Sequence, residues 1–396
     1  MTSAGDVDWS EMCSDAIQLI LEILSFSDFH RARTVCSKWY SVSKSCVAGS
    51  RNRSPWLILF PEKSCVSKPS KKLFNKVSDT NSCRLYNPAE GKTYRTRYLG
   101  DKLSESRCLA SYGNWILMLD PSLNFYLLNV FTIERINLPS LSLRCEVRFQ
   151  RKDDGGLFLE QSWLDRETII NRYIKTAVLW VDEKTKDFVV CWIYNDQYLF
   201  SFKKGDDSWW HLEGTMCLAM AYKDQKLFVY TYDHHIKILD YSGDIPEEIT
   251  EANPYLNHPF RYDPQLWEYV WKTRLAITTS GDILIILSLK KCSGNEVEHL
   301  FYIFKMNPQA EEWERLDSLG KEMLLFGDGF TLASAASAKE DIDGGVIYFL
   351  ADDVWPPQTN QDPQSSSGAF DLATTKIRWT QPYYYWSKIR WFVPGI

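Results

Sequence analysis

The residues of this sequence that could do chemistry are its six histidines, its ten cysteines and a few acidic pairs, and their spacing favours structural roles. The histidines are dispersed except for His234-His235. Adjacent residues of a strand point to opposite faces, so this pair is a poor chelate and predicts a hairpin turn. The cysteines form no C-x-x-C pair, and no histidine cluster has the spacing of zinc ligands. We therefore expect no metal site and no cofactor.

The acidic residues and the glycines also lack a catalytic pattern. The acidic pairs stand beside glycine or serine, which is typical of turns, and a calcium site requires more than two oxygen ligands; they are Asp153-Asp154, Asp206-Asp207 and Asp352-Asp353. The sequence has no nucleophile elbow, zinc-protease motif or phosphate-binding glycine loop, and Gly327-Asp328-Gly329 is too short to count. We predict that the chain is not an enzyme.

Aromatic residues are the more informative group, with 16 Trp, 21 Tyr and 20 Phe. They gather at Trp209-Trp210-His211, at Trp267 with Trp271, and at Tyr383-Tyr384-Tyr385-Trp386. Side chains alternate along a strand, so some of these rings must face outward, and exposed Trp and Tyr are common anchors of protein interfaces. Packing between strands is the alternative. The predicted target-binding residues are Trp209, Trp210, Trp267, Trp271, Tyr384 and Trp386.

Length and charge limit the function classes. The 396 residues allow two domains or one large one, and the net charge of −6 argues against a dedicated nucleic-acid binder. We expect no signal peptide, because Asp6, Asp8 and Glu11 interrupt any apolar run in residues 1–11, and no stretch approaches a membrane span of about 20 residues. We expect a cytoplasmic or nuclear protein that is neither secreted nor membrane-bound. Residues 68–72 are lysine-rich and predict a solvated loop or, alternatively, a nuclear-import signal.

A sustained helical period occurs only near the front of the chain, from Trp9 to about Cys46. Ser14 is placed as an N-cap and Asp15 suits the positive end of the helix dipole. Two apolar stripes follow at helical spacing: Ile17, Ile20, Leu21 and Leu24, then Val35, Cys36, Trp39 and Tyr40. About 40 residues bury too little surface to be secure alone. The helices must pack against the rest of the chain or form a docking surface that a partner covers.

This segment resembles an F-box, the adaptor-binding module of cullin-based ubiquitin ligases. The residues that fall on the pattern are Asp15, Ile17, Ile20, Leu24, Asp28, Arg31, Arg33, Val35, Cys36 and Trp39. Met12-Cys13 replaces the usual Leu-Pro, which removes a fixed φ at the start of the first helix and bears on adaptor affinity. The resemblance implies docking on a Skp-type adaptor and, through it, on cullin and RING subunits. The adaptor-binding residues would be Met12, Cys13, Ile17, Ile20, Leu21, Leu24, Val35, Cys36 and Trp39.

From about residue 80 a strand that ends in Asn or Asp recurs, followed by a polar turn and a second strand. The marker residues are Asn87, Asn129, Asp182, Asp240, Asn307 and Asp371. A repeat of about 40–50 residues made of four short strands is typical of a β-propeller blade. The chain after residue 54 would then supply seven or eight blades, although the spacing of the markers is uneven. A β-sandwich of repeated hairpins is the alternative.

A second resemblance supports the propeller. The segment Leu319–Phe349 and the ending Trp391-Phe392-Val393-Pro394 are similar to the C-terminal region of a large plant F-box group that carries a kelch-like domain. We therefore expect an α+β multidomain chain, in which a small all-α F-box of about three helices precedes a mostly antiparallel all-β domain. The expected division is a disordered N-terminus (1–8), the F-box (9–50), a linker with the first strand (51–80) and the propeller (81–396).

Together the two resemblances imply the substrate-recognition subunit of a Skp–cullin–F-box ubiquitin ligase. The F-box would dock on the adaptor and the β domain would hold an unknown target protein, with no active site in this chain. Two alternatives stay open. One is a stand-alone propeller that binds a small molecule or a glycan, and the other is a propeller enzyme with acidic or histidine side chains around its axis.

Overall fold

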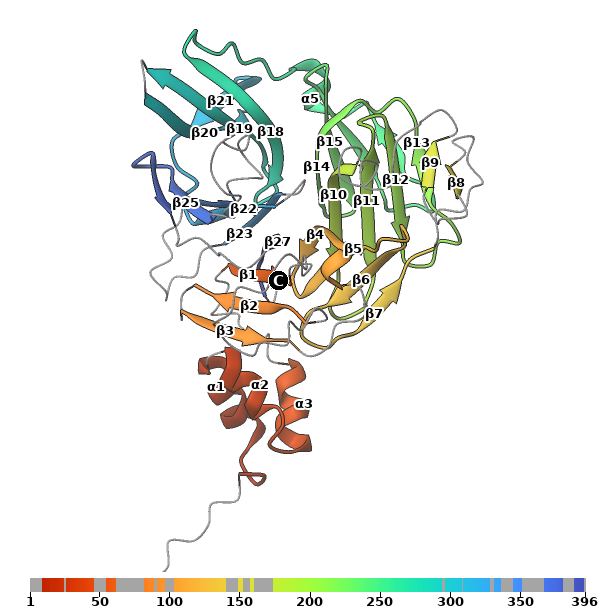
Figure 1. The fold of residues 1–396 in the computed structure, drawn as a ribbon, viewed down its shortest axis with the longest axis vertical. Helices are drawn as coiled ribbons and strands as arrows, with labels where there is room; N and C mark the ends of the chain where they lie inside the picture. The colour runs from red at the N-terminus through yellow and green to blue at the C-terminus, as the bar shows by residue number, and fades with distance from the viewer. Residues whose placement is uncertain are drawn as a thin grey trace, which may run out of the picture.

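Three short helices precede a ring of six β-sheets in the computed structural model of this chain (Figure 1). The structure describes residues 9–24, 26–45, 55–61, 82–88, 91–96, 103–139, 149–151, 157–159, 174–293, 296–307, 309–327, 331–335, 345–350, 367–379 and 388–394. The helices are α1 (Ser14–Ile23), α2 (Phe26–Ala32) and α3 (Ser37–Ser45). They lie below the outer strands of the first sheet in Figure 1.

Each of the first three blades is a four-stranded sheet. From the innermost strand outward, blade 1 contains β27 (Lys388–Phe392), β1 (Trp56–Phe60), β2 (Arg84–Asn87) and β3 (Lys92–Arg95). In the same order, blade 2 contains β4 (Arg107–Tyr112), β5 (Trp115–Leu119), β6 (Phe125–Asn129) and β7 (Arg135–Asn137). Blade 3 contains β10 (Ile174–Val181), β11 (Phe188–Tyr194), β12 (Tyr198–Lys203) and β13 (Trp210–Leu212).

The other three blades complete the ring. Blade 4 contains β14 (Cys217–Lys223), β15 (Lys226–Thr231), β16 (Ile236–Asp240) and β17 (Glu247–Ile249). Blade 5 contains β18 (Glu268–Ile277), β19 (Ile283–Ser293), β20 (Glu296–Asn307) and β21 (Glu312–Leu316). Blade 6 contains β23 (Thr331–Ala335), β22 (Glu322–Phe326), β24 (Val346–Leu350), β25 (Ser367–Asp371) and β26 (Lys376–Trp379). The smaller elements are η1 (Leu103–Glu105), the hairpin β8 (Phe149–Arg151) and β9 (Leu157–Leu159), and α5 (Pro254–Asn257).

The propeller therefore has six blades, and the prediction of seven or eight was wrong. The error came from dividing the length by a uniform repeat. The strands β18, β19 and β20 of blade 5 have 10, 11 and 12 residues, whereas β2 and β3 of blade 1 have 4 each. The segment between β7 and β10 also lengthens the chain without adding a blade. Its described strands, β8 and β9, form a separate two-stranded sheet. Blade 6 differs in topology, because β22 pairs with β24 in parallel and with β23 in antiparallel.

The ring is closed by the last strand of the chain. β27 pairs with β1 in antiparallel register from Trp56 opposite Phe392 to Phe60 opposite Lys388. The hydroxyl of Ser111, on the innermost strand of blade 2, donates to the carbonyl oxygen of Trp391 at 3.0 Å. Blade 1 thus combines strands from the start and from the end of the propeller sequence. Its innermost strand, β27, is also joined to blade 2 by the Ser111 hydrogen bond.

The core lies between neighbouring blades, where large aromatic side chains pack face to face. Trp192 of blade 3 stacks on Phe125 of blade 2 with ring centroids 4.9 Å apart and on Phe200 of its own blade at 4.4 Å. Trp115 and Trp192 are fully buried in this cluster. Because side chains alternate between the two faces of a strand, each blade packs against the blades on both of its sides. This explains why so many aromatic residues occur in the sequence.

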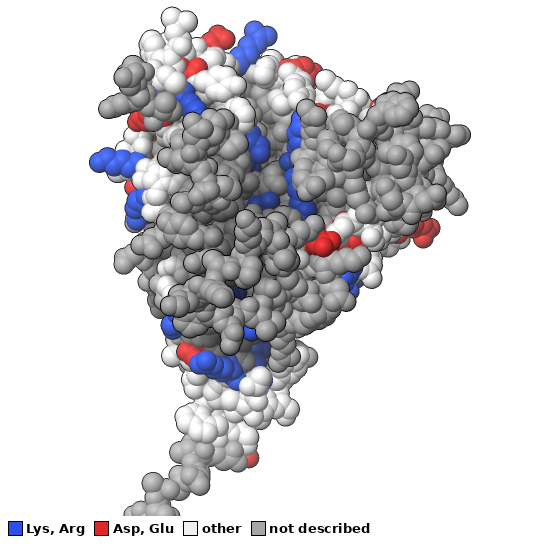
Figure 2. Space-filling view, in the orientation of Figure 1, with Lys and Arg blue, Asp and Glu red and all other residues white. Residues whose placement is uncertain are grey.

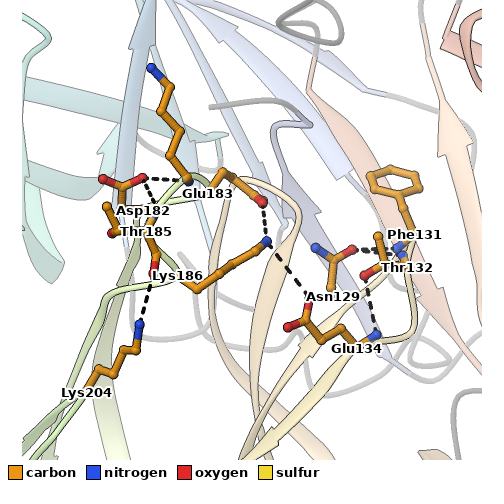
Figure 3. A network of polar contacts seen from close by, with 10 residues as sticks. Asn129, Phe131, Thr132, Glu134, Asp182, Glu183, Thr185, Lys186 and Lys204 are labelled. Atoms are coloured by element: carbon orange, nitrogen blue, oxygen red, sulfur yellow. Dashed lines mark hydrogen bonds and ion pairs between the residues drawn. The ribbon is translucent and has the colours of Figure 1, made fainter. Parts of the chain in front are cut away.

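The strand-ending Asn and Asp residues form the turns that the sequence predicts (Figure 3). The side chain of Asn129 accepts from the backbone N–H groups of Phe131 and Thr132, both at 3.0 Å. Asp182 does the same for Lys184 at 2.7 Å and Thr185 at 3.3 Å. Equivalent acceptors follow at Asp240, Asn307 and Asp371. The side chain replaces the backbone partner that a tight turn lacks.

The two turns in Figure 3 belong to different blades and are joined by Lys186. Its ammonium group lies 3.0 Å from a carboxylate oxygen of Glu183 and 3.9 Å from one of Glu134 in blade 2. It also lies 5.1 Å from the centre of the Trp115 ring, within the range of a cation–π contact. This contact fixes the β10–β11 turn of blade 3 against its neighbour.

Candidate functional site

Helix α1 carries an apolar surface that grades from buried to exposed around the helix. Ile17 and Leu21 are buried, Ile20 and Leu24 are half-buried, and Leu19 and Ile23 are 63% and 69% exposed. At about 100° per residue these six positions form one continuous arc. The buried side packs on α2 and α3, so only the far side of the arc is open.

The helical unit has its own small core. Ile17, Leu21, Phe29, Ala32 and Trp39 form a cluster that contains no residue of the propeller. The indole N–H of Trp39 donates to the carbonyl oxygen of Trp9 at 3.0 Å, which fixes the segment before α1 on α3. The guanidinium of Arg33 lies 5.8 Å from the Phe29 ring and 5.4 Å from the Tyr40 ring, and so joins α2 to α3.

The nine residues predicted to bind an adaptor are thus divided between core and surface. Ile17, Leu21 and Trp39 are buried within the unit and hold it together. The others are at least partly exposed: Met12, Cys13, Ile20, Leu24, Val35 and Cys36. Sequence reasoning missed Leu19 and Ile23, because it counted only one stripe. Their own spacing of four residues, beside that stripe, was the signal.

The start of α1 differs from the expectation in one detail. Cys13, not Ser14, is the N-cap, and it makes no side-chain capping hydrogen bond. Its φ is −64° and its ψ is 150°, which is the backbone geometry that a proline adopts. The position where the F-box pattern has proline therefore keeps the same geometry with cysteine.

An exposed aromatic patch lies at the start of β18. It consists of Leu266, Trp267, Tyr269 and Trp271, which are 103%, 48%, 57% and 42% exposed. The rings of Tyr269 and Trp271 have their centroids 6.3 Å apart. Tyr269 and Trp271 are both exposed on β18, whose pairing with β19 is shifted between Val270 and Lys272, and Trp267 precedes the strand. We call these four residues the β18 patch.

Glu268 holds the opposite side of the same strand. Its carboxylate accepts from the hydroxyl of Tyr262 at 2.5 Å and from that of Tyr302 at 2.7 Å. Desolvation raises the pKa of Glu268, but these hydrogen bonds outweigh it and keep the pKa below the ordinary value. The carboxylate thus ties the start of β18, next to the β18 patch, to Tyr262 and to Tyr302 of β20.

The other predicted target-binding residues lie elsewhere. Trp209 is buried in the cluster between blades 2 and 3, where its indole N–H donates to the carbonyl oxygen of Pro139 at 2.9 Å. Trp210 is half-buried in β13. Tyr384 and Trp386 lie outside the described residues. Of the four predicted residues that the structure describes, Trp267 and Trp271 are the exposed ones and lie in the β18 patch.

A cavity of about 310 Å³ lies at one mouth of the central channel, where the innermost strands end. Tyr112, Trp180 and Tyr222 line it from three successive blades. The rings of Trp180 and Tyr222 are 5.9 Å apart. Burial raises the pKa of Tyr112 and of Tyr222, so both phenols are neutral at physiological pH. Lys223 turns its ammonium group to the carbonyl oxygens of Thr278 and Thr279, at 2.8 and 2.5 Å.

The remaining sequence predictions concern single turns. His234 has a φ of +66° and lies in the β15–β16 hairpin, which confirms the expected turn. Asp206 forms a turn after β12, where it accepts from the N–H of Lys203 at 2.8 Å. The other two acidic pairs and residues 68–72 lie outside the described residues. Within the described part of the chain, no His, Cys, Asp and Glu side chains gather in a group that could hold a metal ion.

None of the described helices combines the length and the apolar character that a membrane crossing requires.

Comparison with known proteins gives two family matches along the chain. Residues 9–49 match the F-box domain and residues 85–371 match the KIB1-4 beta-propeller. Among Arabidopsis thaliana proteins, At2g33200, which is named as an F-box protein, is 45% identical over 401 residues that cover 98% of each chain. F-box only protein 7 is 39% identical over 405 residues, covering 98% of this chain and 94% of the relative. F-box protein KIB4 is 35% identical over 346 residues, covering 85% and 80%.

The fold and these matches define a plant F-box protein that carries a β-propeller. The chain belongs to the family with a KIB1-4 beta-propeller. The predicted F-box and propeller are confirmed, whereas the match does not specify the kelch-like subtype. Neither match indicates a catalytic domain.

Proposed function

We propose that the chain is the substrate-recognition subunit of a Skp–cullin–F-box ubiquitin ligase. The F-box domain supports this role, and the exposed apolar arc of α1 is the observation that carries it. Burial of Leu19 or Ile23 against a partner helix would contribute about 1.5–3 kcal/mol of free energy for each side chain, relative to leaving it exposed to water. The adaptor would link the chain to a cullin and a RING subunit.

The experiment is co-purification with a Skp-type adaptor. Leu19→Asp and Ile23→Asp place charges on the exposed side of the arc, and we expect each to lower the recovery of adaptor about tenfold or more. Gln18→Asp is the matched control, because Gln18 is exposed on the same helix but outside the arc. Unchanged recovery with both apolar variants would refute the proposal. Trp39→Ala is unsuitable, since Trp39 belongs to the core of the unit.

The propeller is proposed to hold the target protein. The β18 patch is the surface that supports this, because exposed aromatic clusters of this kind anchor protein interfaces. Holding the target beside the other subunits would make ubiquitin transfer effectively intramolecular. This chain would supply proximity and specificity, while other subunits catalyse the transfer. The expected location in the cytoplasm or nucleus remains part of the proposal.

The target surface is tested by affinity purification and mass spectrometry of the full chain. We expect the double variant Trp267→Ala and Trp271→Ala to lose target proteins and to keep the adaptor. Ile245→Ala is the control, since Ile245 is 64% exposed in the β16–β17 connection of blade 4 and is not part of the β18 patch. Retention of every partner by the double variant would exclude the patch.

A second candidate function rests on the cavity at the channel mouth. Its volume of about 310 Å³ is in the range of small-molecule sites, and three aromatic rings line it beside Thr278 and Asp224. A small ring-shaped polar ligand, such as a sugar, fits this combination of flat apolar and hydrogen-bonding walls. Loss of binding in Trp180→Ala on a glycan array would support it, and no binding by the unaltered chain would refute it.

A further inference from the structure

Three aromatic rings in the cavity at the channel mouth form a partial cage. Tyr112, Trp180 and Tyr222 lie at or next to the ends of β4, β10 and β14, the innermost strands of three successive blades. The planes of the Trp180 and Tyr222 rings are tilted by 49°, so the two rings do not lie flat on each other. All three side chains are half-buried and line the cavity, so part of each ring is open to a ligand.

The cage is held in place by its surroundings. The buried Tyr241 packs edge-on against the ring of Tyr222, with ring centroids 5.7 Å apart and an angle of 84° between the planes. Burial raises the pKa of Tyr112, and a side-chain hydrogen bond with Trp180 opposes this rise, so these two cage residues are direct neighbours. Binding therefore does not have to order the rings first, which favours affinity.

A carboxylate lies beside the rings. Asp224 is exposed at the turn between β14 and β15 and also lines the cavity. Within the described part of the chain, its carboxylate takes part in no hydrogen bond or ion pair. Burial is the main reason why the pKa values of Tyr112 and Tyr222 are raised, and the negative charge of Asp224 raises both further. One carboxylate thus acts on two of the three rings.

Lys223 is the basic residue of the cavity wall, and its charge is directed to blade 5. The ammonium group donates to the carbonyl oxygens of Thr278 and Thr279 at 2.8 and 2.5 Å. It also lies near Asp282: a hydrogen bond from Lys305 is the main cause of the lowered pKa of that carboxyl, and the charge of Lys223 contributes. The charge of Lys223 is therefore offset within blade 5, whereas that of Asp224 is left for a ligand.

The centre of the molecule makes this carboxylate more important. Figure 2 shows Lys and Arg side chains in the central hollow, between β18 and the strands β10 and β14. A cation gains nothing from such surroundings, so its binding would depend on the carboxylate of Asp224 and on the aromatic rings. The effect of removing either one should therefore be large.

We propose that the cage and Asp224 bind a quaternary ammonium group, either the side chain of a trimethylated lysine in a partner protein or the head of a free choline-like molecule. The faces of aromatic rings attract cations, and the methyl groups bury apolar surface against the rings. An unmethylated ammonium fits less well, because it is compact and strongly hydrated. A neutral sugar can stack on the same rings but gains nothing from Asp224. The inference thus goes beyond the second candidate function, and it does not depend on the ligase role.

The test is isothermal titration calorimetry of the full chain. The probes are choline, its neutral analogue neohexanol with carbon in place of the nitrogen, the neutral sugar cellobiose, and a short peptide with either trimethyllysine or lysine. We expect choline to bind at least about tenfold more tightly than neohexanol, because only the charge differs. Equal binding of neohexanol, or no binding of any quaternary ammonium probe, would overturn the proposal. Binding of cellobiose alone would overturn it and support the sugar site.

The peptides identify the source of the group. If the trimethyllysine peptide binds more tightly than choline and than the lysine peptide, the ligand belongs to a partner protein. If choline binds at least as tightly as the trimethyllysine peptide, the ligand is a free small molecule. Either result supports the proposed cage.

A charge variant locates the site. Asp224→Asn should weaken choline about fivefold or more and leave neohexanol unchanged. The backbone φ at Asp224 is +49°, which asparagine also adopts readily, so the turn should be kept. Asp207→Asn is the matched control, since Asp207 is exposed in the β12–β13 connection, away from the cavity, and its substitution makes the same change in charge. Equal affinities for choline in the two variants would refute the role of Asp224.

Ring variants give the second measurement. Trp180→Leu should weaken choline about tenfold or more, and Trp180→Phe, which keeps an aromatic ring, should have a smaller effect. Trp379→Leu makes the same chemical change on the outermost strand β26 and should leave the affinity unchanged. Unaltered binding of choline to Trp180→Leu would contradict the cage. Adaptor recovery is measured separately, so a failure here is distinct from a failure of the ligase proposal.

Discussion

At the scale of single residues, Cys13 shows how the F-box can depart from its pattern without a change of shape. Its φ of −64° already matches the value that proline imposes. We predict that Cys13→Pro stabilises the start of α1 by about 0.4–1 kcal/mol, because it restricts the unfolded chain. Hydrogen exchange of the α1 amides in the full chain should slow about two- to fivefold, with Cys13→Ala as a control that gives no such gain. Faster exchange in the proline variant would contradict this geometry.

Cysteine reactivity is a second property set by single residues. Burial raises the pKa of the Cys83 thiol and of the Cys191 thiol from 9.0 to about 12, against opposing hydrogen bonds from Thr96 and Tyr241. The neutral thiol is a poor nucleophile, so iodoacetamide should label the exposed Cys13 and Cys292 and spare these two in the native protein. Mass spectrometry of labelled peptides measures this. Rapid labelling of Cys191 at neutral pH would contradict its burial.

The same shift has a consequence for stability in alkali. The folded state keeps these protons up to about pH 12, whereas the unfolded thiols lose them near 9.0. The unfolded state therefore binds fewer protons between these values, and stability falls as the pH rises through that window.

At the scale of elements, the sequence predicted the outer hairpins well because each is decided by local chemistry. An Asn or Asp at the end of a strand caps the turn with its own side chain, as Asn129 does. The residue that caps the turn and the N–H groups that it accepts from lie within four residues of each other in the sequence. The helix stripes were predicted for the same reason, since Ile17 and Leu21 follow a local period. Which side of α1 stays open depends on where α2 and α3 pack, and so Leu19 and Ile23 were missed.

The hairpin turns give a direct test at this scale. Asn129 is 2% exposed, and Asn129→Ala leaves the N–H groups of Phe131 and Thr132 without their acceptor. We expect a loss of about 1–3 kcal/mol in the free energy of unfolding, measured as a lower urea midpoint. Asn137→Ala, at an exposed position of the next strand, should change it by less than about 0.5 kcal/mol. Equal midpoints for the two variants would show that the turn contributes nothing.

At the scale of the whole molecule, the blade number escaped prediction because it depends on contacts between distant residues. Strand lengths vary among blades, and an insertion in sequence counts as a blade only if it pairs into the ring. The cavity at the channel mouth was hidden in the same way. Tyr112, Trp180 and Tyr222 lie on three separate strands, so the fact that they line one cavity is visible only once the topology places these strands around one axis.

Closure of the ring is the property that belongs to the molecule as a whole, and Trp391 tests it. This residue lies on β27, is 1% exposed, pairs with Leu57 and accepts through its carbonyl oxygen from Ser111. Trp391→Ala should cost about 3–5 kcal/mol, because a large cavity opens where the last strand joins the first. Trp379→Ala makes the same chemical change on the outermost strand β26, where Trp379 is 50% exposed, and should cost clearly less. Urea unfolding of the full chain measures both. If the ring were held mainly by its other blades, the two variants would lose similar stability, and the closing strand would be dispensable.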